Sequence, residues 1–249
     1  MFSGSPSTPH IRKRALVTGG AKRVGRELAL ALARAGMDVA ITFRDSKAEA
    51  EKTRLGIEAL GVRAVALELD VRSEASVRGA VAATVEAFGG IDVLVNNAAV
   101  FESAPLAEIT IDQWDAMFAT NTRGPFLVAR EALPHLKAAR GRIVNLGSLG
   151  GSHPWATHAH YCSSKAALHM LTQTMAKAFA PEVSVNCVAP GYVEFEASKV
   201  DKEAQRFAAK TPMKRNATAN DVAAAAMLFA AGPHFITGQI LTVDGGLGL

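Results

Sequence analysis

The chain has 249 residues, of which 49% are hydrophobic, 20% are charged and two are cysteine. A chain of this length buries a core of its own, so collagen-like, disordered and disulfide-rich proteins are excluded. The formal charge of +4 is concentrated at Arg12, Lys13 and Arg14, and only 6% of residues are aromatic, which argues against a nucleic-acid partner. No apolar run reaches the roughly 20 residues of a membrane-spanning helix. We therefore expect a cytoplasmic protein with neither a nucleic-acid nor a membrane partner.

Short apolar runs of strand length alternate with longer segments of helical period along the whole chain. The expected strands are 15–18, 39–42, 64–68, 93–96, 143–146, 183–188 and 240–243. The expected helices are 24–35, 47–60, 76–88, 112–137, 161–180 and 221–231. This alternation predicts an α/β fold in one domain, a doubly wound seven-stranded parallel sheet with helices on both faces.

Two segments fall outside the alternation. Residues 1–12 are rich in Ser, Pro and Gly in their first part and are interpreted as a flexible tail, which leaves a single domain over 13–249. The longest stretch without a regular prediction is 191–219. A long excursion from a small domain is often a substrate lid, although an ordinary surface loop with one helix fits equally well.

A glycine-rich turn leads from the first expected strand directly into a helix. Glycine lets the backbone approach a phosphate, and a helix N-terminus offers free N–H groups and partial positive charge to a pyrophosphate. The turn therefore predicts dinucleotide binding, against the alternative of a tight strand-to-helix turn. The candidate cofactor residues in it are Thr18, Gly19, Lys22, Arg23, Val24 and Gly25.

The end of the second expected strand favours NADP(H) over NAD(H). Sites for NAD usually place Asp or Glu here to bind the ribose 2′-hydroxyl, but this chain has Phe43 followed by Arg44. Arg44 can pair with a 2′-phosphate, helped by Lys22 or Arg23. Asp45 follows directly, and a solvated surface position for Arg44 is the alternative.

The spacing of Tyr161 and Lys165, with Ser148 thirteen residues upstream of the tyrosine, resembles the short-chain dehydrogenase/reductase family. The resemblance covers nearly the whole chain. It implies a Rossmann-type domain, hydride transfer between a nicotinamide and a carbonyl or imine, and a homotetramer or homodimer formed through helices 112–137 and 161–180 and the C-terminal region. Its further motif positions are the glycine turn, Asp70, the Asn96-Asn97-Ala98 segment, Asn121, Pro190-Gly191 and Asp244-Gly245-Gly246.

The residue types at these positions suit acid–base chemistry on a carbonyl. Tyr161 and Lys165 lie one helical turn apart, and a nearby ammonium should lower the pKa of the phenol toward working pH. Tyr161 would then protonate the alkoxide that hydride transfer creates, while Ser148 stabilises it. The family resemblance adds that Lys165 holds the nicotinamide ribose and that Asn121 positions a proton-relaying water.

The resemblance also implies further cofactor contacts. Asp70 with Val71 is expected at the adenine, although an Asp after a strand is more often a cap. Backbone groups of Asn97 and Ala98 are expected along the cofactor. The same holds for the segment after the sixth strand, at Pro190, Gly191 and Val193.

Two departures from the common pattern bear on the substrate. Arg23 replaces a glycine of the turn, and Phe101 follows Asn96 by five positions, as in the pteridine reductase branch, where a Phe stacks on the pterin. Ser148 stands where pteridine reductases usually carry Asp, so Phe101 is equally a simple pocket wall. Phe195 replaces a Thr that commonly holds the nicotinamide carboxamide.

The loop between Ser148 and Tyr161 should border the substrate, so His153 and Trp155 are predicted to line the pocket. Its three histidines lack a carboxylate or second cysteine that would complete a metal site, and no metal is expected. The leading hypothesis is an NADPH-dependent reductase of a small carbonyl compound. The alternatives are a pteridine reductase, a 3-oxoacyl-carrier-protein-type reductase and, in another class, a catalytically silent NADP-binding sensor.

Overall fold

The computed structural model describes residues 12–195 and 202–249, and its centre is a seven-stranded sheet. The strand order is β3-β2-β1-β4-β5-β6-β9, and every neighbouring pair is parallel. All seven predicted strands are confirmed within two residues. They are β1 (Arg14–Val17), β2 (Asp38–Phe43), β3 (Ala64–Glu68), β4 (Val93–Asn96), β5 (Arg142–Leu146), β6 (Ser184–Pro190) and β9 (Ile240–Val243).

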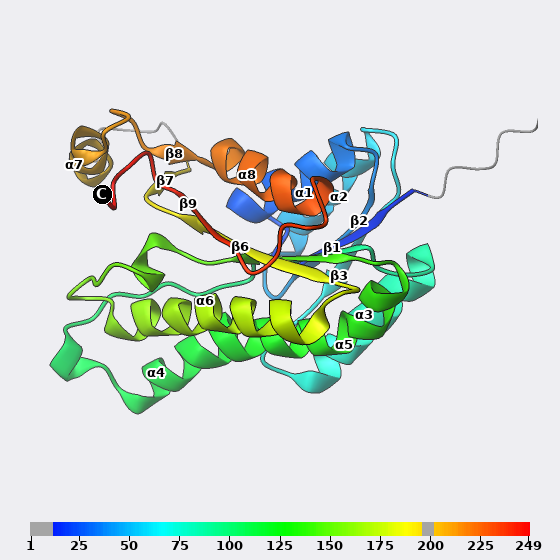
Figure 1. Cartoon of the computed structure of the whole chain (residues 1–249), viewed down its shortest axis with the longest axis horizontal. Coiled ribbons are helices and arrows are strands. Elements are labelled where there is room, and N and C mark those ends of the chain that lie inside the picture. The colour runs from blue at the N-terminus through cyan, green and yellow to red at the C-terminus, as the bar shows by residue number, and fades with distance from the viewer. Residues whose placement is uncertain (1–11, 196–201) are drawn as a thin grey trace, which may run out of the picture.

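Helices cover both faces of the sheet (Figure 1). One face carries α1 (Arg23–Arg34), α2 (Lys47–Glu58) and α8 (Ala219–Ala231), and the other carries α3 (Glu74–Phe88), α5 (Gly124–Ala138) and α6 (Ala159–Phe179). Each layer encloses its own apolar core, because the strands are buried on both sides. Leu28 and Leu32 of α1, for example, pack into the first core. The predicted doubly wound fold is thereby confirmed.

The strand order reverses between β1 and β4. Loops after the carboxyl ends of these two strands diverge to opposite faces, which opens a crevice at this point in folds of this type. The glycine turn follows β1, and the Asn97-Ala98 segment follows β4. The topology therefore brings two of the predicted cofactor segments together.

The helix predicted over 112–137 is divided into α4 (Ile111–Phe118), a π-helical turn (Ala119–Arg123) and α5. Pro125 lies four residues after Asn121 and has no N–H, so the carbonyl of Asn121 lacks its usual helical donor. Turns of this type occur frequently at functional sites. Asn121, a predicted catalytic residue, lies within it.

The segment predicted as a lid contains more structure than a loop. The short strands β7 (Val193–Glu194) and β8 (Ala217–Thr218) pair in parallel, and α7 (Lys202–Lys210) lies between them in the sequence. Residues 196–201 of this segment, like 1–11 of the predicted tail, lie outside the described residues, so the lid and the tail stay predictions. In the parts that the structure describes, no helix is long and apolar enough to cross a membrane.

Candidate active site

Thr18 and Asn97 join the glycine turn to the end of β4. The Thr18 hydroxyl accepts hydrogen bonds from the backbone N–H groups of Asn97 and Ala98, both at 3.0 Å. The side-chain amide of Asn97 donates to the carbonyls of Thr18 and Gly19, both at 2.9 Å. These four bonds hold the glycine turn against the segment after β4, and the two segments together form a cradle. Thr18 and Asn97, both predicted cofactor residues, thus have a structural role in it.

The cradle has no room for side chains where a dinucleotide would pass. A Cβ on Gly25 would lie 2.2 Å from the carbonyl oxygen of Gly19, and Gly19 itself has a left-handed φ of 63°. Lys22, at the N-cap of α1, makes no side-chain hydrogen bond to the first turn. Arg23 takes a φ of 53° and is exposed beside it. Backbone N–H groups, cations and the absence of side-chain bulk together fit a pyrophosphate.

Arg44 and Arg72 lie at the ends of β2 and β3, where an adenosine ribose is expected. Arg44 donates to Asp45 at 2.6 Å, and Arg72 holds both carboxylate oxygens of Asp70. The Arg72 hydrogen bonds lower the pKa of Asp70 to about 2, and the charge of Arg44 adds to this effect. Asp70 is thus an ion-pair partner, and its contact with adenine stays a prediction. Arg72 was missed from the sequence, although it follows a motif position by only two residues.

The side chain of Val71 packs inside the protein, and its contact with the adenine stays a prediction. It is buried, and its side chain lies against Gly124 at the start of α5, where a Cβ would approach Val71 Cγ2 to 2.8 Å. Gly191, after β6, is similarly close to Asp244, and its N–H donates to the carbonyl of Val243. Pro190 ends β6 and Val193 begins β7, so the predicted cofactor contacts of this segment stay predictions.

Ser148, Tyr161 and Lys165 converge beyond the end of β5. Ser148 is buried, and its Oγ accepts from the N–H of Gly150 at 3.1 Å. Lys165, also buried, donates to the carbonyl of Leu146 at 2.7 Å, and its Nζ lies 5.9 Å from the centre of the Tyr161 ring. The loop after β5 and the first turns of α6 thus position the predicted catalytic group.

The pKa values of this group differ from the sequence-based expectation. Burial raises the pKa of Tyr161 above its ordinary value, and a hydrogen bond with Ser148 opposes this effect only in part. The predicted lowering of the phenol pKa is therefore wrong for this structure, because burial outweighs the groups that favour the phenolate. Sequence could not show how deeply the phenol is buried. A raised pKa keeps the proton on Tyr161 at neutral pH, which suits a general acid.

Lys165 should make the free energy of unfolding depend on pH. Burial lowers the pKa of Lys165 from 10.5 to about 8. Between these values the unfolded chain binds more protons, so stability rises with pH through this window. From pH 7 to 9.5 the wild type should gain about 2 kcal/mol relative to Lys165→Met, which lacks this titration. Urea unfolding at both pH values measures the difference, and equal changes in the two proteins would contradict the expectation.

Asn121 is fully buried and fixes the segment after β4. Its Oδ1 accepts from the N–H of Val100, and its Nδ2 donates to the Val100 carbonyl, both at 2.9 Å. Its Nδ2 also lies 3.1 Å from Ser164 Oγ, next to Lys165. The side chain is therefore occupied by protein partners, and the backbone carbonyl is the group left for the predicted water.

The rings of Phe101 and Trp155 contact the Tyr161 ring, and His158 contacts both of them. Phe101 stacks on His158 and meets the Tyr161 ring edge-on, with centroids 4.8 Å apart in both pairs. Trp155 stacks on Tyr161 at 6.0 Å. Phe101 is 63% exposed, so its ring is available to a ligand. The predicted placement of Phe101 and Trp155 beside Tyr161 matches this geometry, whereas His158 was missed.

The other histidines of this region face elsewhere. The Nε2 of His153 pairs with the carbonyl of Gly248 at 2.8 Å, which ties the loop to the C-terminal segment. His160 is buried in α6. Among the residues described, no group of three His, Cys, Asp or Glu side chains could hold a metal ion. Phe195 lies instead under Arg23, whose guanidinium is 5.3 Å from the ring centre.

Fold and site together define an oxidoreductase on a Rossmann-like domain. A family model described as enoyl-(acyl carrier protein) reductase matches residues 19–248. Relatives and solved structures that match along nearly the whole chain are short-chain dehydrogenases and reductases. The chain belongs to the short-chain dehydrogenase/reductase family.

Two of the relatives and one of the solved structures show how similar these proteins are to the chain. An uncharacterized oxidoreductase of Methylorubrum extorquens is 35% identical in an alignment of 243 positions that covers 94% of this chain and 97% of the relative. A 3-oxoacyl-(acyl-carrier-protein) reductase of Staphylococcus epidermidis is 34% identical, with coverage of 95% and 99%. A short-chain dehydrogenase of Burkholderia cenocepacia, solved in complex with NADP, is 39% identical with a TM-score of 0.89, covering 96% of this chain and 99% of its own.

Proposed function

We propose that this protein is an NADPH-dependent carbonyl reductase whose substrate carries a flat, apolar group next to the carbonyl. The observation that carries the proposal is the Tyr161 phenol, half-buried beside Ser148 and flanked by the rings of Phe101 and Trp155. A catalytic acid in an aromatic pocket suits an aryl ketone better than a long aliphatic chain. The solved relative that binds NADP supports the choice of nucleotide.

The residues present fit the proposed mechanism. When bound, the nicotinamide supplies the hydride. The Ser148 hydroxyl and the Tyr161 phenol hydrogen-bond the substrate oxygen, and the phenol gives up its proton as negative charge develops there. Lys165, held by the Leu146 carbonyl with its Nζ 5.9 Å from the centre of the Tyr161 ring, would bind the nicotinamide ribose. The glycine cradle, Arg44 and Arg72 orient the nucleotide.

Pterin reduction is the second candidate, and a specific contact favours it. Phe101 offers an exposed ring face, and Arg23 with Phe195 forms a cation–π pair across the mouth of the glycine turn. A planar heterocycle between these groups would have both a stacking partner and a cation. Ser148 lacks the acidity that a ring nitrogen would require, which places this candidate second.

NADPH consumption with a substrate panel tests the proposal. We expect turnover of aryl ketones, and we expect Phe101→Leu to lose about 5-fold in kcat/KM for aryl ketones, since an aromatic pair contributes about 1 kcal/mol. Simple aliphatic ketones should be unaffected by the substitution. Turnover of a dihydropterin alone would favour the second candidate, and turnover of an acyl thioester alone would favour the 3-oxoacyl type. NADPH binding without any turnover would favour a sensor.

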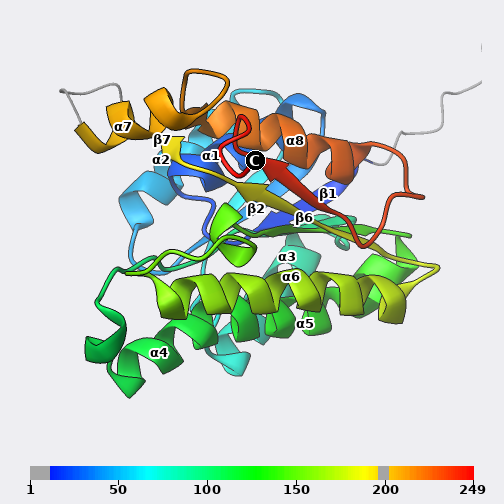
Figure 2. The same ribbon diagram turned by 60° about the vertical axis from the view of Figure 1, so that its left-hand side comes forward.

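We also propose that the α5 and α6 face joins two copies of this chain. The two helices run alongside each other on one side of the molecule (Figure 2). The exposed apolar side chains Trp114, Phe126 and Met170 lie on α4, α5 and α6, and Phe126 also lines a hollow of about 920 Å³. Apolar surface of this kind is typical of an interface. Light scattering decides the matter, because a mass near the 26.1 kDa of one chain would contradict the proposal.

A further inference from the structure

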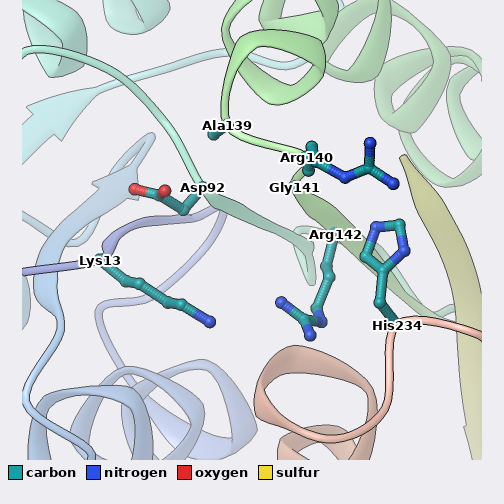
Figure 3. A pocket seen from close by; sticks show the side chains of 7 residues that line it. All are labelled: Lys13, Asp92, Ala139, Arg140, Gly141, Arg142 and His234. Atoms are coloured by element: carbon teal, nitrogen blue, oxygen red, sulfur yellow. The ribbon is translucent and has the colours of Figure 1, made fainter. Parts of the chain in front are cut away.

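A second cavity lies at the opposite end of the sheet from Ser148. Its volume is about 260 Å³, and Figure 3 shows the side chains that surround it. Lys13 precedes β1, Asp92 precedes β4 and Arg142 begins β5, so the cavity lies at the amino ends of the strands. The predicted cofactor and catalytic residues follow the carboxyl ends. The complete lining is Lys13, Asp92, Ala139, Arg140, Gly141, Arg142 and His234.

The cavity has an excess of positive charge. Asp92 is its one carboxylate, and that group is already occupied by the backbone N–H and Nε of Arg14, at 2.9 and 2.6 Å. Within the described ranges, 12–195 and 202–249, no ion pair is found for Lys13, Arg140 or Arg142. Figure 3 shows Lys13 and Arg142 extending toward each other while the carboxylate of Asp92 points away. Three cations therefore share one cavity without a counter-charge of their own.

Two nitrogen atoms of the lining are buried and have no hydrogen-bond partner among the residues that the structure describes. They are Nε of Arg142 and Nε2 of His234. The Arg142 guanidinium is held in place at its other end, where Nη2 donates to the carbonyl of Gly232 at 2.8 Å. Burial lowers the pKa of Arg142, since nothing nearby compensates the desolvated charge. Buried donors usually have acceptors, so this pair indicates a missing acceptor.

Arg140 has an unusual backbone for its residue type. It follows the C-cap of α5, Ala139, with a left-handed φ of 47°. Glycine is the residue that ordinarily occupies this position after a helix, because it has no Cβ to clash. An arginine at this position accepts an unfavourable left-handed backbone conformation and places its guanidinium at the cavity rim. The chain thus places a cation where local geometry favours glycine.

We propose that this cavity is a binding site for a small phosphate-type oxyanion, either free phosphate or the phosphoryl group of a small ester. The guanidinium of Arg142 and the imidazole of His234 would donate to its oxygens from inside, while Lys13 and Arg140 neutralise its charge at the rim. Arginine forks match the oxygen geometry of phosphate. β5 leads from Arg142 to Leu146, which accepts the Lys165 hydrogen bond, so an occupant would contact the strand that supports the catalytic group.

Calorimetric titration tests the site without reference to catalysis. Inorganic phosphate and glycerol phosphate are titrated in low salt, first into the protein alone and then with NADPH at saturation. With NADPH at saturation, which fills the nucleotide cradle, we expect one phosphate to bind per chain. The protein alone should bind at least this one. Tighter binding of the ester would identify an esterified ligand, and equal or tighter binding of phosphate would identify the free anion.

A double variant in the cavity and a control variant outside it test where phosphate binds. Lys13→Gln combined with Arg140→Gly should weaken phosphate binding by at least 10-fold, and the glycine keeps the left-handed turn intact. Arg78→Gln removes an exposed cation from α3, outside the cavity, and should leave the affinity unchanged. Phosphate binding that is lost with NADPH present, or that is equal in the double variant and the wild type, would overturn the proposal. So would the absence of binding to the wild type.

Discussion

Tyr161→Phe should lower kcat for carbonyl reduction by about 10²- to 10⁴-fold, the usual contribution of a positioned general acid. The substitution removes the phenol hydroxyl and leaves the ring contacts with Phe101 and Trp155 in place. Because burial raises the pKa of Tyr161, the phenol carries its proton through the neutral range, and the loss should be nearly constant there. Steady-state kinetics of NADPH oxidation measures it.

The other tyrosine of the chain provides a matched control. Tyr192 stacks on Phe207 with ring centroids 4.6 Å apart, and Tyr192→Phe retains this stack. We expect its kcat to stay within a few-fold of the wild-type value. Fluorescence titration should show that Tyr161→Phe still binds NADPH, so that the loss is chemical. A Tyr161→Phe enzyme that retains more than a tenth of wild-type kcat would refute the role of the phenol.

Replacing both Arg44 and Arg72 with Gln should weaken NADPH binding by about 10- to 100-fold and leave NADH binding nearly unchanged. A hydrogen bond to a charged group contributes about 1.5–3 kcal/mol, and the 2′-phosphate is the only group by which the two nucleotides differ. The exposed ion pairs that are lost with Asp45 and Asp70 contribute little to stability. Dissociation constants for both nucleotides provide the comparison.

The charge change itself needs a control, because any lost cation weakens long-range attraction to a phosphate. Arg78→Gln, outside the site, removes one positive charge and should change NADPH affinity less than two-fold. If the double variant weakens NADH and NADPH equally, the arginines bind the shared part of the nucleotide. If it weakens neither, NADP(H) preference lies with Lys22 and Arg23.

The fold was largely predictable because its signals are local. The run 93–96, for example, is a strand with the same limits in the structure, since its three apolar residues Val93, Leu94 and Val95 are buried on both faces of the sheet. The division of helix 112–137 was not predicted. The signal for it, Pro125 one turn after Asn121, looks like an ordinary helix-start proline until the π turn is seen.

The site residues that belong to a sequence motif were predictable. The site residues whose role depends on three-dimensional contacts were not. Ser148, Tyr161 and Lys165 were identified by spacing alone. Arg72 was missed because its importance depends on its bonds to Asp70 and its closeness to Arg44. The pKa of Tyr161 depends on how many atoms exclude water from the phenol. The spacing of residues in the sequence does not reveal that number.

The hydrogen bonds between Thr18 and Asn97 connect residues 79 positions apart in sequence. Contacts of such long range cost loop-closure entropy and are characteristic of slowly folding topologies. The nucleotide cradle therefore requires that two distant segments of the chain be folded together. A dinucleotide that binds the cradle stabilises the native state by mass action. It thereby lowers the fraction of unfolded chains that proteases can cleave. Nucleotide supply in the cell would thus set how long each copy of this protein survives.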